Sequence, residues 1–512
     1  MTSDFDNQGR LGVVGCGLMG RGIAQIAVQG GIPVILHDSR PGAAEEAREA
    51  IAATLDKLAA KGKLAAQDVS DAVARLAVAA TLADLAPCGT VVEAIVERLD
   101  AKQSLFRELE AVVGADCILA TNTSSLSVTA IAAACRAPGR VAGFHFFSPV
   151  PLMKIVEVIA GPLTDASVAD RLVDIARRMG HAPVRASDTP GFIVNHAGRG
   201  YLTESLRLLG ENVAAHAELD RILRDAAGFR MGPFELLDLT GLDVSQPVME
   251  SIYDQYYQEP RFRPSPLARQ RLAAGLLGRK SGRGFYAYED GKKQDIPGPP
   301  VPVPARADVA VWLDAADAAA FPAVDALLDA LLAALGAARD RGARPAAGSL
   351  CLVLPVGQDA TGAAVAAGLD PARTVALDPL FLAGRRTLMT TPLTAPAVRD
   401  AAHALFAADG TPVSVVRDSA GLICQRVVAT IVNIGADIAQ QGIATPADID
   451  QAVTLGLGYP RGPLALGDAL GAATVMRILD GLFDTYRDPR YRPSPWLRRR
   501  ALLGVSLLTP DN

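Results

Sequence analysis

A histidine and a glutamate are the side chains best suited to acid–base chemistry in this chain. His145 ends an apolar run, and Glu157 stands in the middle of a second run, KIVEVI, at residues 154–159. Side chains alternate along a strand, so Glu157 shares a face with Ile155 and Ile159, where an unpaired carboxylate would be costly. A carboxylate behind an imidazole fixes its tautomer and raises its basicity. The pair could therefore take a proton from a hydroxyl group while hydride leaves the same carbon.

The chain offers few other histidines for this chemistry, and each has a plainer role beside an acidic residue, in a loop or on a helix. They are His37, His181, His196, His216 and His403. A buried His–Glu pair with a purely structural role is the alternative that the residues leave open.

Three glycines near the N-terminus predict a nucleotide-binding turn. An apolar run at residues 11–14 leads into Gly15, Gly17 and Gly20, and an apolar-periodic segment follows at residues 18–28. In a strand–turn–helix unit, Gly15 makes the turn, Gly17 lets a pyrophosphate approach the backbone and Gly20 lets the helix pack closely on the strand. The pyrophosphate would lie at the helix N-terminus. A glycine-rich turn without a ligand is the alternative.

An acidic residue after the next strand indicates which dinucleotide is bound. Asp38 follows an apolar run at residues 33–36. Its carboxylate can accept both ribose hydroxyls of NAD, whereas the phosphate of NADP would place like charges about 4 Å apart at a cost of ~1–4 kcal/mol. The sequence therefore predicts NAD as the cofactor.

Polar residues follow two further predicted strands. The strand at residues 90–96 would deliver Glu97 to the carboxyl edge of the sheet, with Lys102 shortly after it, and the strand at residues 117–121 leads to Ser124. Ligands of doubly wound sheets lie beyond these strand ends, so we expect contacts with cofactor or substrate there. Helix N-capping is the alternative for the hydroxyl groups.

A long helical pattern at residues 40–64 carries Thr54 and Lys61 on one face, two turns apart. Such charges are typical of a solvated amphipathic helix. A handle for a phosphate-rich substrate is the alternative interpretation.

The chain repeats itself in weakened form. The phrase at residues 217–233 recurs at residues 447–463, a shift of 230 residues, and DTPGFIVN returns as DSAGLICQ, so that Gln425 stands where Asn195 stood. A proline-rich linker precedes the second copy, whose alanine-rich first part has one strand candidate, at residues 350–355, and no glycine loop. We infer one active site per chain.

Composition excludes several classes of protein. The 512 residues are 50% hydrophobic and 21% charged, which is typical of a globular chain of several domains. The net charge of −5 provides no overall positive potential that would attract nucleic acid. No apolar run approaches the ~18 residues of a membrane span, and the polar, acidic N-terminus is unlike a signal peptide, so we expect a cytoplasmic location. Six scattered cysteines indicate neither a zinc site nor a disulfide framework.

Several separated phrases resemble the L-3-hydroxyacyl-CoA dehydrogenases of fatty-acid and aromatic-acid catabolism. Between residues 10 and 288 they are GVVGCGLMGRGIA, VVEAIVE, ATNTSSL, FHFFSPVPLMKIVEVI, DTPGFIVN, GPFELLDLTGLD and GRKSGRGFY. The second half is similar to the extension of long bacterial enzymes of the 3-hydroxybutyryl-CoA or 3-hydroxyadipyl-CoA type. The resemblance implies NAD-dependent oxidation of an L-3-hydroxyacyl-CoA to a 3-ketoacyl-CoA.

The resemblance also implies roles for individual residues. His145 matches the family's base, Glu157 its orienting acid, and Ser124 and Asn195 the polar residues around the substrate oxygen. Implied cofactor contacts are Gly15, Gly17, Leu18, Met19, Gly20, Asp38, Glu97, Lys102, Ser124, Ser148 and Lys280, and implied CoA contacts are Thr54, Lys61 and Ser124. Ser148 is a departure, because many relatives have Asn there.

The implied fold is α/β. An N-terminal Rossmann dinucleotide-binding domain is followed by an all-α domain, then by a degenerate reduced-Rossmann plus all-α repeat. We expect the NAD-binding domain at 1–187, the helical domain at 188–290, the linker at 291–305, the degenerate domain at 306–412 and the second helical domain at 413–512. The family implies a homodimer through the helical domains, and pairing of the two copies within one chain is the alternative.

Two rival functions remain at the level of sequence. One is a non-catalytic NAD-binding protein of the same fold, which the joint presence of the four polar site residues disfavours. The other is a dehydrogenase of free β-hydroxyacids with a lysine base, but the helix after Pro190 carries Asn195 and His196 in place of a lysine.

The assignment of Asp38 leads to a prediction about the cofactor. We expect kcat/KM to favour NAD over NADP by about tenfold or more, and Asp38→Ala to reduce this ratio, because the mutant no longer repels the 2′-phosphate. Steady-state kinetics with both cofactors measures the ratio. An unchanged ratio would refute the role of Asp38.

Overall fold

The computed structural model describes residues 9–303 and 310–511, which form two compact units. One unit comprises Met1–His196 with Gln441–Leu457, and the other comprises Ala197–Gln440 with Gly458–Asn512. The polar N-terminal residues 1–8 and residues 304–309, where the predicted linker meets the next predicted domain, lie outside the described residues.

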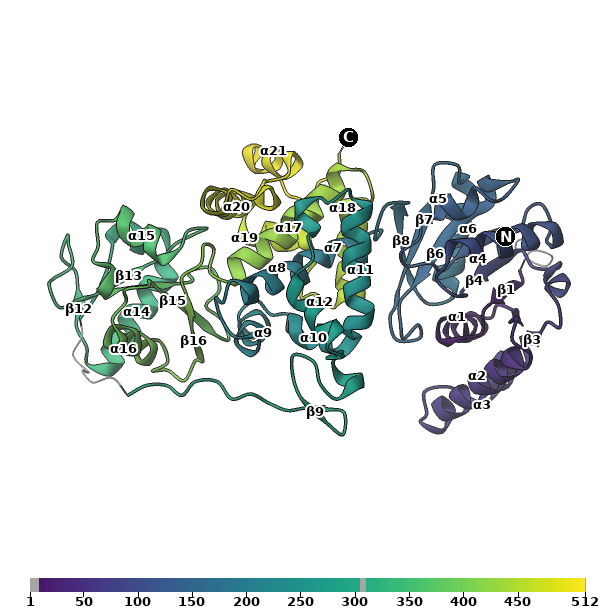
Figure 1. Cartoon of the computed structure of the whole chain (residues 1–512), viewed down its shortest axis with the longest axis horizontal. Coiled ribbons are helices and arrows are strands. Elements are labelled where there is room, and N and C mark those ends of the chain that lie inside the picture. The colour runs from purple at the N-terminus through teal and green to yellow at the C-terminus, as the bar shows by residue number, and fades with distance from the viewer. Residues whose placement is uncertain (1–8, 304–309, 512) are drawn as a thin grey trace. The chain divides into compact units, whose positions relative to one another are not determined.

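An eight-stranded sheet organises the described part of the first unit (Figure 1). The strands are β1 (Leu11–Val14), β2 (Val34–His37), β3 (Leu76–Val78), β4 (Thr90–Glu93), β5 (Ile118–Thr121), β6 (Val141–Phe146), β7 (Ile155–Ala160) and β8 (Ala182–Ser187). They lie in the order β3-β2-β1-β4-β5-β6-β7-β8, and β6 and β7 are antiparallel while the other neighbours are parallel. The strand order reverses between β1 and β4, which is where such sheets bind ligands.

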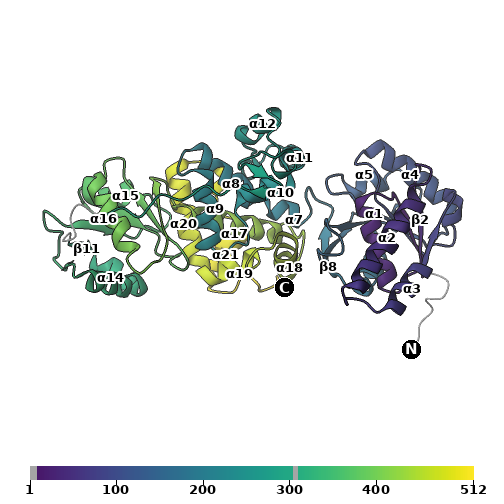
Figure 2. The ribbon, with the colours of Figure 1, turned by 90° about the horizontal axis from the view of Figure 1, so that it is seen from below.

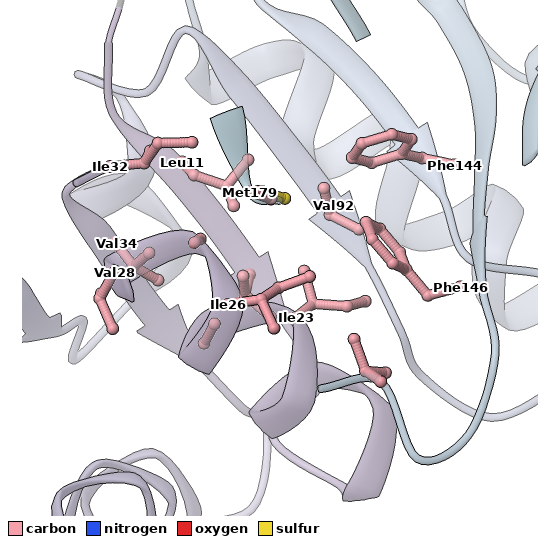
Figure 3. Close-up of a cluster of buried hydrophobic side chains, with 14 of the residues drawn as sticks. Leu11, Ile23, Ile26, Val28, Ile32, Val34, Val92, Phe144, Phe146 and Met179 are labelled. Atoms are coloured by element: carbon pink, nitrogen blue, oxygen red, sulfur yellow. The ribbon is translucent and has the colours of Figure 1, made fainter. Parts of the chain in front are cut away.

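Helices of the first unit cover both faces of this sheet. They are α1 (Leu18–Gln29), α2 (Ala43–Ala60), α3 (Ala66–Ala74), α4 (Leu99–Val112), α5 (Val128–Ala132), α6 (Ala166–Arg178), α7 (Val194–Ala197) and α18 (Pro446–Leu457). Helices α1, α2 and α6 share one apolar core, into which Phe144 and Phe146 point (Figure 3). Alternation along β6 places Gly143 and His145 on the other face, where Gly143 lies against Val128 of α5. The apolar core thereby fixes which way His145 points.

Two helical repeats pack against each other in the second unit. Their helices are α8 (Arg199–Gly210), α9 (His216–Asp225), α10 (Pro233–Thr240), α11 (Leu242–Gln255), α12 (Pro266–Ala273), α17 (Cys424–Gln440), α19 (Pro463–Leu470), α20 (Ala472–Tyr486) and α21 (Pro495–Leu503). Helix α17 is central and contacts α8, α19, α20 and α21 (Figure 2). A Cβ at Gly200 of α8 would lie 3.1–3.4 Å from atoms of Ile431 and Ile434 of α17, so glycine permits the close approach of the two helices.

The first arginines of the repeated phrases RFRPSP and RYRPSP each bond to a backbone carbonyl of the other repeat. Arg261 donates a hydrogen bond to the carbonyl of Arg492 (2.9 Å), and Arg490 donates one to the carbonyl of Pro260 (3.1 Å). These two bonds join the helical repeats to each other within one chain.

A buried ionic network crosses the contact between α8 and α17. Arg426, with a fully buried side chain, donates to Glu204 (2.5 Å) and Glu211 (2.7 Å), and Arg490 and the Tyr491 hydroxyl also bind Glu204. Burial raises the pKa of Glu204, but the two arginines and the Tyr491 hydroxyl outweigh burial and lower the pKa to about 2. The carboxylate thus stays charged, and each charge in the network depends on its partners.

The alanine-rich stretch after the linker forms a second sheet, with six strands in the part of the chain that is described. They are β11 (Val311–Leu313), β12 (Arg339–Asp340), β13 (Leu350–Val353), β14 (Thr374–Leu377), β15 (Arg386–Thr390) and β16 (Val413–Arg417), in the order β12-β11-β13-β14-β15-β16. The helices around it are α13 (Ala315–Ala320), α14 (Pro322–Leu335), α15 (Ala360–Ala366) and α16 (Pro396–Phe406). The expectation of a single strand here was wrong, because the remaining strands have only two to five residues and lie among alanine-rich helices. The predicted α/β fold class is confirmed.

Short elements complete the fold. A hairpin of β9 (Tyr288–Glu289) and β10 (Lys292–Lys293) takes up the first residues of the predicted linker. The 3-10 turns lie at Leu82–Leu85, Pro138–Arg140, Pro260–Phe262, Arg279–Ser281, Pro371–Arg373 and Pro489–Tyr491. Among the described residues, no helix is both long and apolar enough to cross a membrane.

The buried network makes a prediction about stability. We expect Arg426→Met to lower the free energy of unfolding by ~3–5 kcal/mol, since it leaves Glu204 buried without its main partner. Urea denaturation measures the effect. The control is Arg487→Met, which breaks the exposed pair with Asp484 and should cost less than ~1 kcal/mol. Equal effects of the two substitutions would contradict this account of the interface.

Candidate active site

The turn between β1 and α1 has the geometry that its glycines predict. Gly15 has a φ of +96°, and a Cβ on Gly20 would lie 1.8 Å from the carbonyl oxygen of Gly15. Gly17 caps α1, and a Cβ there would meet no described atom within 4 Å. Leu18 and Met19 follow in the first turn of the helix, with Leu18 65% exposed. The backbone at Gly17 is thus open to a phosphate group.

Asp38 is held beside this turn. One oxygen of its carboxylate accepts the N–H of Cys16 (2.7 Å), and the other accepts the N–H of Arg40 (2.9 Å). The side chain is therefore fixed at the end of β2, and its remaining lone pairs can accept ribose hydroxyls. Turn, helix N-terminus and carboxylate together fit NAD.

A carboxylate that the sequence analysis overlooked lies at the end of β4. The strand ends at Glu93, earlier than the predicted residue 96, and Glu93 is fully buried. Lys102, only 1% exposed, binds Glu93 (2.6 Å) and Glu97 (3.3 Å). Lys102 therefore supports two acids at the edge of the sheet, and its direct contact with the cofactor stays a prediction.

Glu97 in turn holds the segment after β5. One oxygen accepts the Thr123 hydroxyl (2.7 Å), the N–H of Ser124 (2.8 Å) and the N–H of Ser125 (3.0 Å). Burial raises the pKa of Glu97, but the Lys102 ammonium and these hydrogen bonds outweigh burial and bring the pKa below its ordinary value. A charged Glu97 thus fixes the backbone that carries Ser124.

The central feature of the site is the pair formed by His145 and Glu157. The two residues are directly opposite each other on β6 and β7, and His145 Nδ1 lies 2.7 Å from Glu157 Oε2. The other carboxylate oxygen accepts the N–H groups of Ile193 (2.9 Å) and Val194 (2.8 Å). Since a carboxylate accepts the hydrogen of Nδ1, His145 Nε2 is left with the lone pair. The predicted pairing of these side chains is present.

Aromatic rings and an asparagine hold the imidazole in place. The ring centroids of Phe147 and Phe192 lie 4.4 and 5.7 Å from that of His145. Asn122, at the end of β5, accepts the N–H of Phe146 (2.9 Å) and so ties the ends of β5 and β6 together. The sequence shows Asn122 only as one of several polar residues after a strand, and no spacing signal identifies this role.

The remaining predicted residues of the first unit occupy varied positions. Asn195 lies on α7, directly after the amides that hold Glu157, and Ser148 is exposed just after β6. Thr54 and Lys61 are exposed at the C-terminal end of α2. Their roles stay predictions.

Lys280 belongs to the second unit, in the turn Arg279–Ser281, where its ammonium lies 2.6 Å from Asp243. Its contact with the cofactor also stays a prediction.

The second sheet contains the positions equivalent to His145 and Glu157, but with other residues. The Thr164 hydroxyl bonds to the carbonyl of Val141 at the start of β6, and the Thr394 hydroxyl makes the equivalent bond to Thr374 at the start of β14. Aligning the two strands at these residues makes Asp378 the counterpart of His145. The N–H of Asp378 bonds to the carbonyl of Thr387, the counterpart of Glu157.

The amide of Gln425, the counterpart of Asn195, donates to Asp378 (3.0 Å). Burial raises the pKa of Asp378 to about 6, although the hydrogen bond from Gln425 opposes the shift. This counterpart has neither an imidazole nor its acid.

Comparison with known proteins agrees with these features. The sequence model of the family's NAD-binding domain (3-hydroxyacyl-CoA dehydrogenase, NAD binding domain) matches residues 10–189. The sequence model of the family's C-terminal domain matches residues 191–288 and again residues 421–506. A 3-hydroxyadipyl-CoA dehydrogenase of Escherichia coli is 37% identical over 508 residues, covering 96% of this chain and 97% of its own. A probable 3-hydroxybutyryl-CoA dehydrogenase of Deinococcus radiodurans is 41% identical over 280 residues, 54% of this chain and all of its own.

A solved structure extends the similarity over both halves. The crystal structure of 3-hydroxybutyryl-CoA dehydrogenase from Escherichia coli matches with a TM-score of 0.85 and 35% identity, covering 97% of this chain and 99% of its own. Residues 10–189 are thus an NAD-binding domain, followed by a duplicated C-terminal domain. The chain belongs to the 3-hydroxyacyl-CoA dehydrogenase family.

Proposed function

We propose that this protein oxidises L-3-hydroxyacyl-CoA thioesters to 3-ketoacyl-CoA thioesters, reversibly, with NAD. The observation that carries the proposal is the 2.7 Å contact of His145 with Glu157 at the edge of the sheet that binds the dinucleotide. NAD, when bound at the glycine turn and Asp38, supplies the acceptor for hydride.

His145 is the proposed base. Its Nε2 takes the proton of the 3-hydroxyl group as hydride leaves the same carbon, and in the reverse direction it returns that proton. Glu157 keeps the acceptor nitrogen at Nε2 and stabilises the imidazolium that forms. Because two backbone N–H groups fix the carboxylate, little reorganisation is needed when the charge develops.

The surrounding polar residues would bind the substrate. Ser124 and Asn195 hold the reacting oxygen in the proposal, and the hydrogen bonds from the Ser124 region to Glu97 support this position. Thr54 on α2 and Lys61 directly after this helix would bind the phosphate-rich CoA handle, and their exposure is compatible with that role.

The acyl group is proposed from the relatives. Those named above are a 3-hydroxyadipyl-CoA dehydrogenase and 3-hydroxybutyryl-CoA dehydrogenases, so short acyl chains, with or without an ω-carboxyl group, are the proposed substrates.

We also propose that the helical repeats of one chain make the two-fold contact that the resemblance assigned to a homodimer. The packing of α8 on α17 and the reciprocal bonds of Arg261 and Arg490 support this arrangement. The homodimer between chains and the cytoplasmic location stay predictions.

An absorbance assay tests the proposed reaction. With acetoacetyl-CoA and NADH we expect NADH to be consumed and 3-hydroxybutyryl-CoA to form. A non-catalytic NAD-binding protein would show no turnover, and a free-acid dehydrogenase would respond only to acids without CoA. Either outcome would contradict the proposal, and comparing kcat/KM for C4, longer and ω-carboxyl substrates then identifies the preferred acyl group.

A second prediction concerns the acid of the pair. We expect Glu157→Gln to lower kcat by about 100-fold or more with little change in KM, since a neutral amide cannot stabilise the imidazolium. The matched control is Glu110→Gln. Glu110 is also a buried carboxylate that accepts two backbone N–H groups, those of Arg136 and Ala137, and its substitution should leave kcat unchanged. A wild-type kcat in Glu157→Gln would remove the pair from the mechanism.

A further inference from the structure

A helix of the second repeat is part of the unit that contains the proposed active site. The N–H of Ser187 at the end of β8 donates to the carbonyl of Ile443 (2.8 Å), just before α18. Helix α18 thus packs on the edge of the first sheet, next to the strand that carries Glu157.

Helix α18 comes close to the site at Gly456. A Cβ on Gly456 would lie 3.0 Å from both Cγ atoms of Val194, closer than side chains normally pack. Val194 is only 1% exposed, so it has little room to move aside.

Val194 connects this contact to the acid of the pair. Its N–H donates to Glu157 Oε1 (2.8 Å), and Glu157 Oε2 in turn lies 2.7 Å from His145 Nδ1. Any side chain at residue 456 would push on Val194, and Val194 carries one of the two amides that hold the carboxylate.

The internal repeat has equivalent positions for these two residues, with different side chains. By the repeat, Val194 corresponds to Cys424 and Gly456 to Ala226, and the Cys424 thiol lies 3.8 Å from the carbonyl of Ile222 on α9. The branched valine thus corresponds to an unbranched cysteine, and the glycine to an alanine. The counterpart pair therefore has a Cβ where Gly456 has none, and one branch fewer than Val194.

We propose that Gly456, in the half of the chain without a catalytic pair, is a positioning residue for His145 and Glu157. The inference rests on the proposed function. It assigns the second repeat a part in catalysis, because α18 sets the place of the amide that orients the base.

Kinetics of Gly456→Ala test the proposal. We expect kcat to fall by about tenfold, with KM for the acyl-CoA nearly unchanged and the acid limb of the kcat–pH profile displaced, because a shift of a few tenths of an ångström reaches the carboxylate. Combining it with Val194→Ala removes both clashing methyl groups, so the double variant should recover to within about threefold of Val194→Ala alone. The control is Gln451→Ala, an exposed residue on the same helix, with wild-type kinetics expected.

The outcomes separate this inference from the proposed function. Wild-type kcat and pH profile in Gly456→Ala, with activity lost in Glu157→Gln, would overturn the inference and leave the proposed function standing. A loss that Val194→Ala does not rescue would also overturn it, since the effect would then arise from the packing of α18 in general. Wild-type activity in Glu157→Gln would instead remove the His145–Glu157 pair from the mechanism. Absence of turnover with acetoacetyl-CoA and NADH in the unsubstituted protein would overturn the proposed function itself.

Discussion

The carboxylate of Glu157 is the constraint on which the active-site geometry depends. A fully buried charge is costly unless every lone pair has a partner, and here one oxygen binds the imidazole while the other accepts two backbone amides. Strand β7 supplies the acid, β6 the base and the turn before α7 the amides, so these three segments have one compatible arrangement. The apolar core on the opposite face, with Phe144 and Phe146, fixes the direction in which His145 points.

The second half shows what remains when such a pair is lost. Asp378, Thr387 and Gln425 occupy the equivalent places, and the glutamine amide now serves the buried aspartate. The duplicated helices instead contribute structure, through the ionic network around Arg426 and through α18 on the edge of the first sheet. This arrangement is consistent with one active site per chain, in the first half, and a structural role for the second half.

Much of the first domain could be predicted because its signals are local. The glycine turn combines residue type with spacing, and alternation along residues 154–159 placed Glu157 on a buried face that needed a cation or an imidazole. Glu93 was missed because the apolar residues after it extend the apparent strand to residue 96. The short strands of the second sheet and the contact of Gly456 with Val194 left no local pattern, since tertiary packing alone creates them.

The central claim is that an imidazole held by a buried acid removes the proton of the substrate hydroxyl. A crystal structure of the protein with NAD and acetoacetyl-CoA tests it most directly. The account predicts His145 Nε2 within about 3 Å of the 3-keto oxygen, with Glu157 still bound to Nδ1. A keto oxygen held by other groups, with the imidazole turned away from it, would contradict the account.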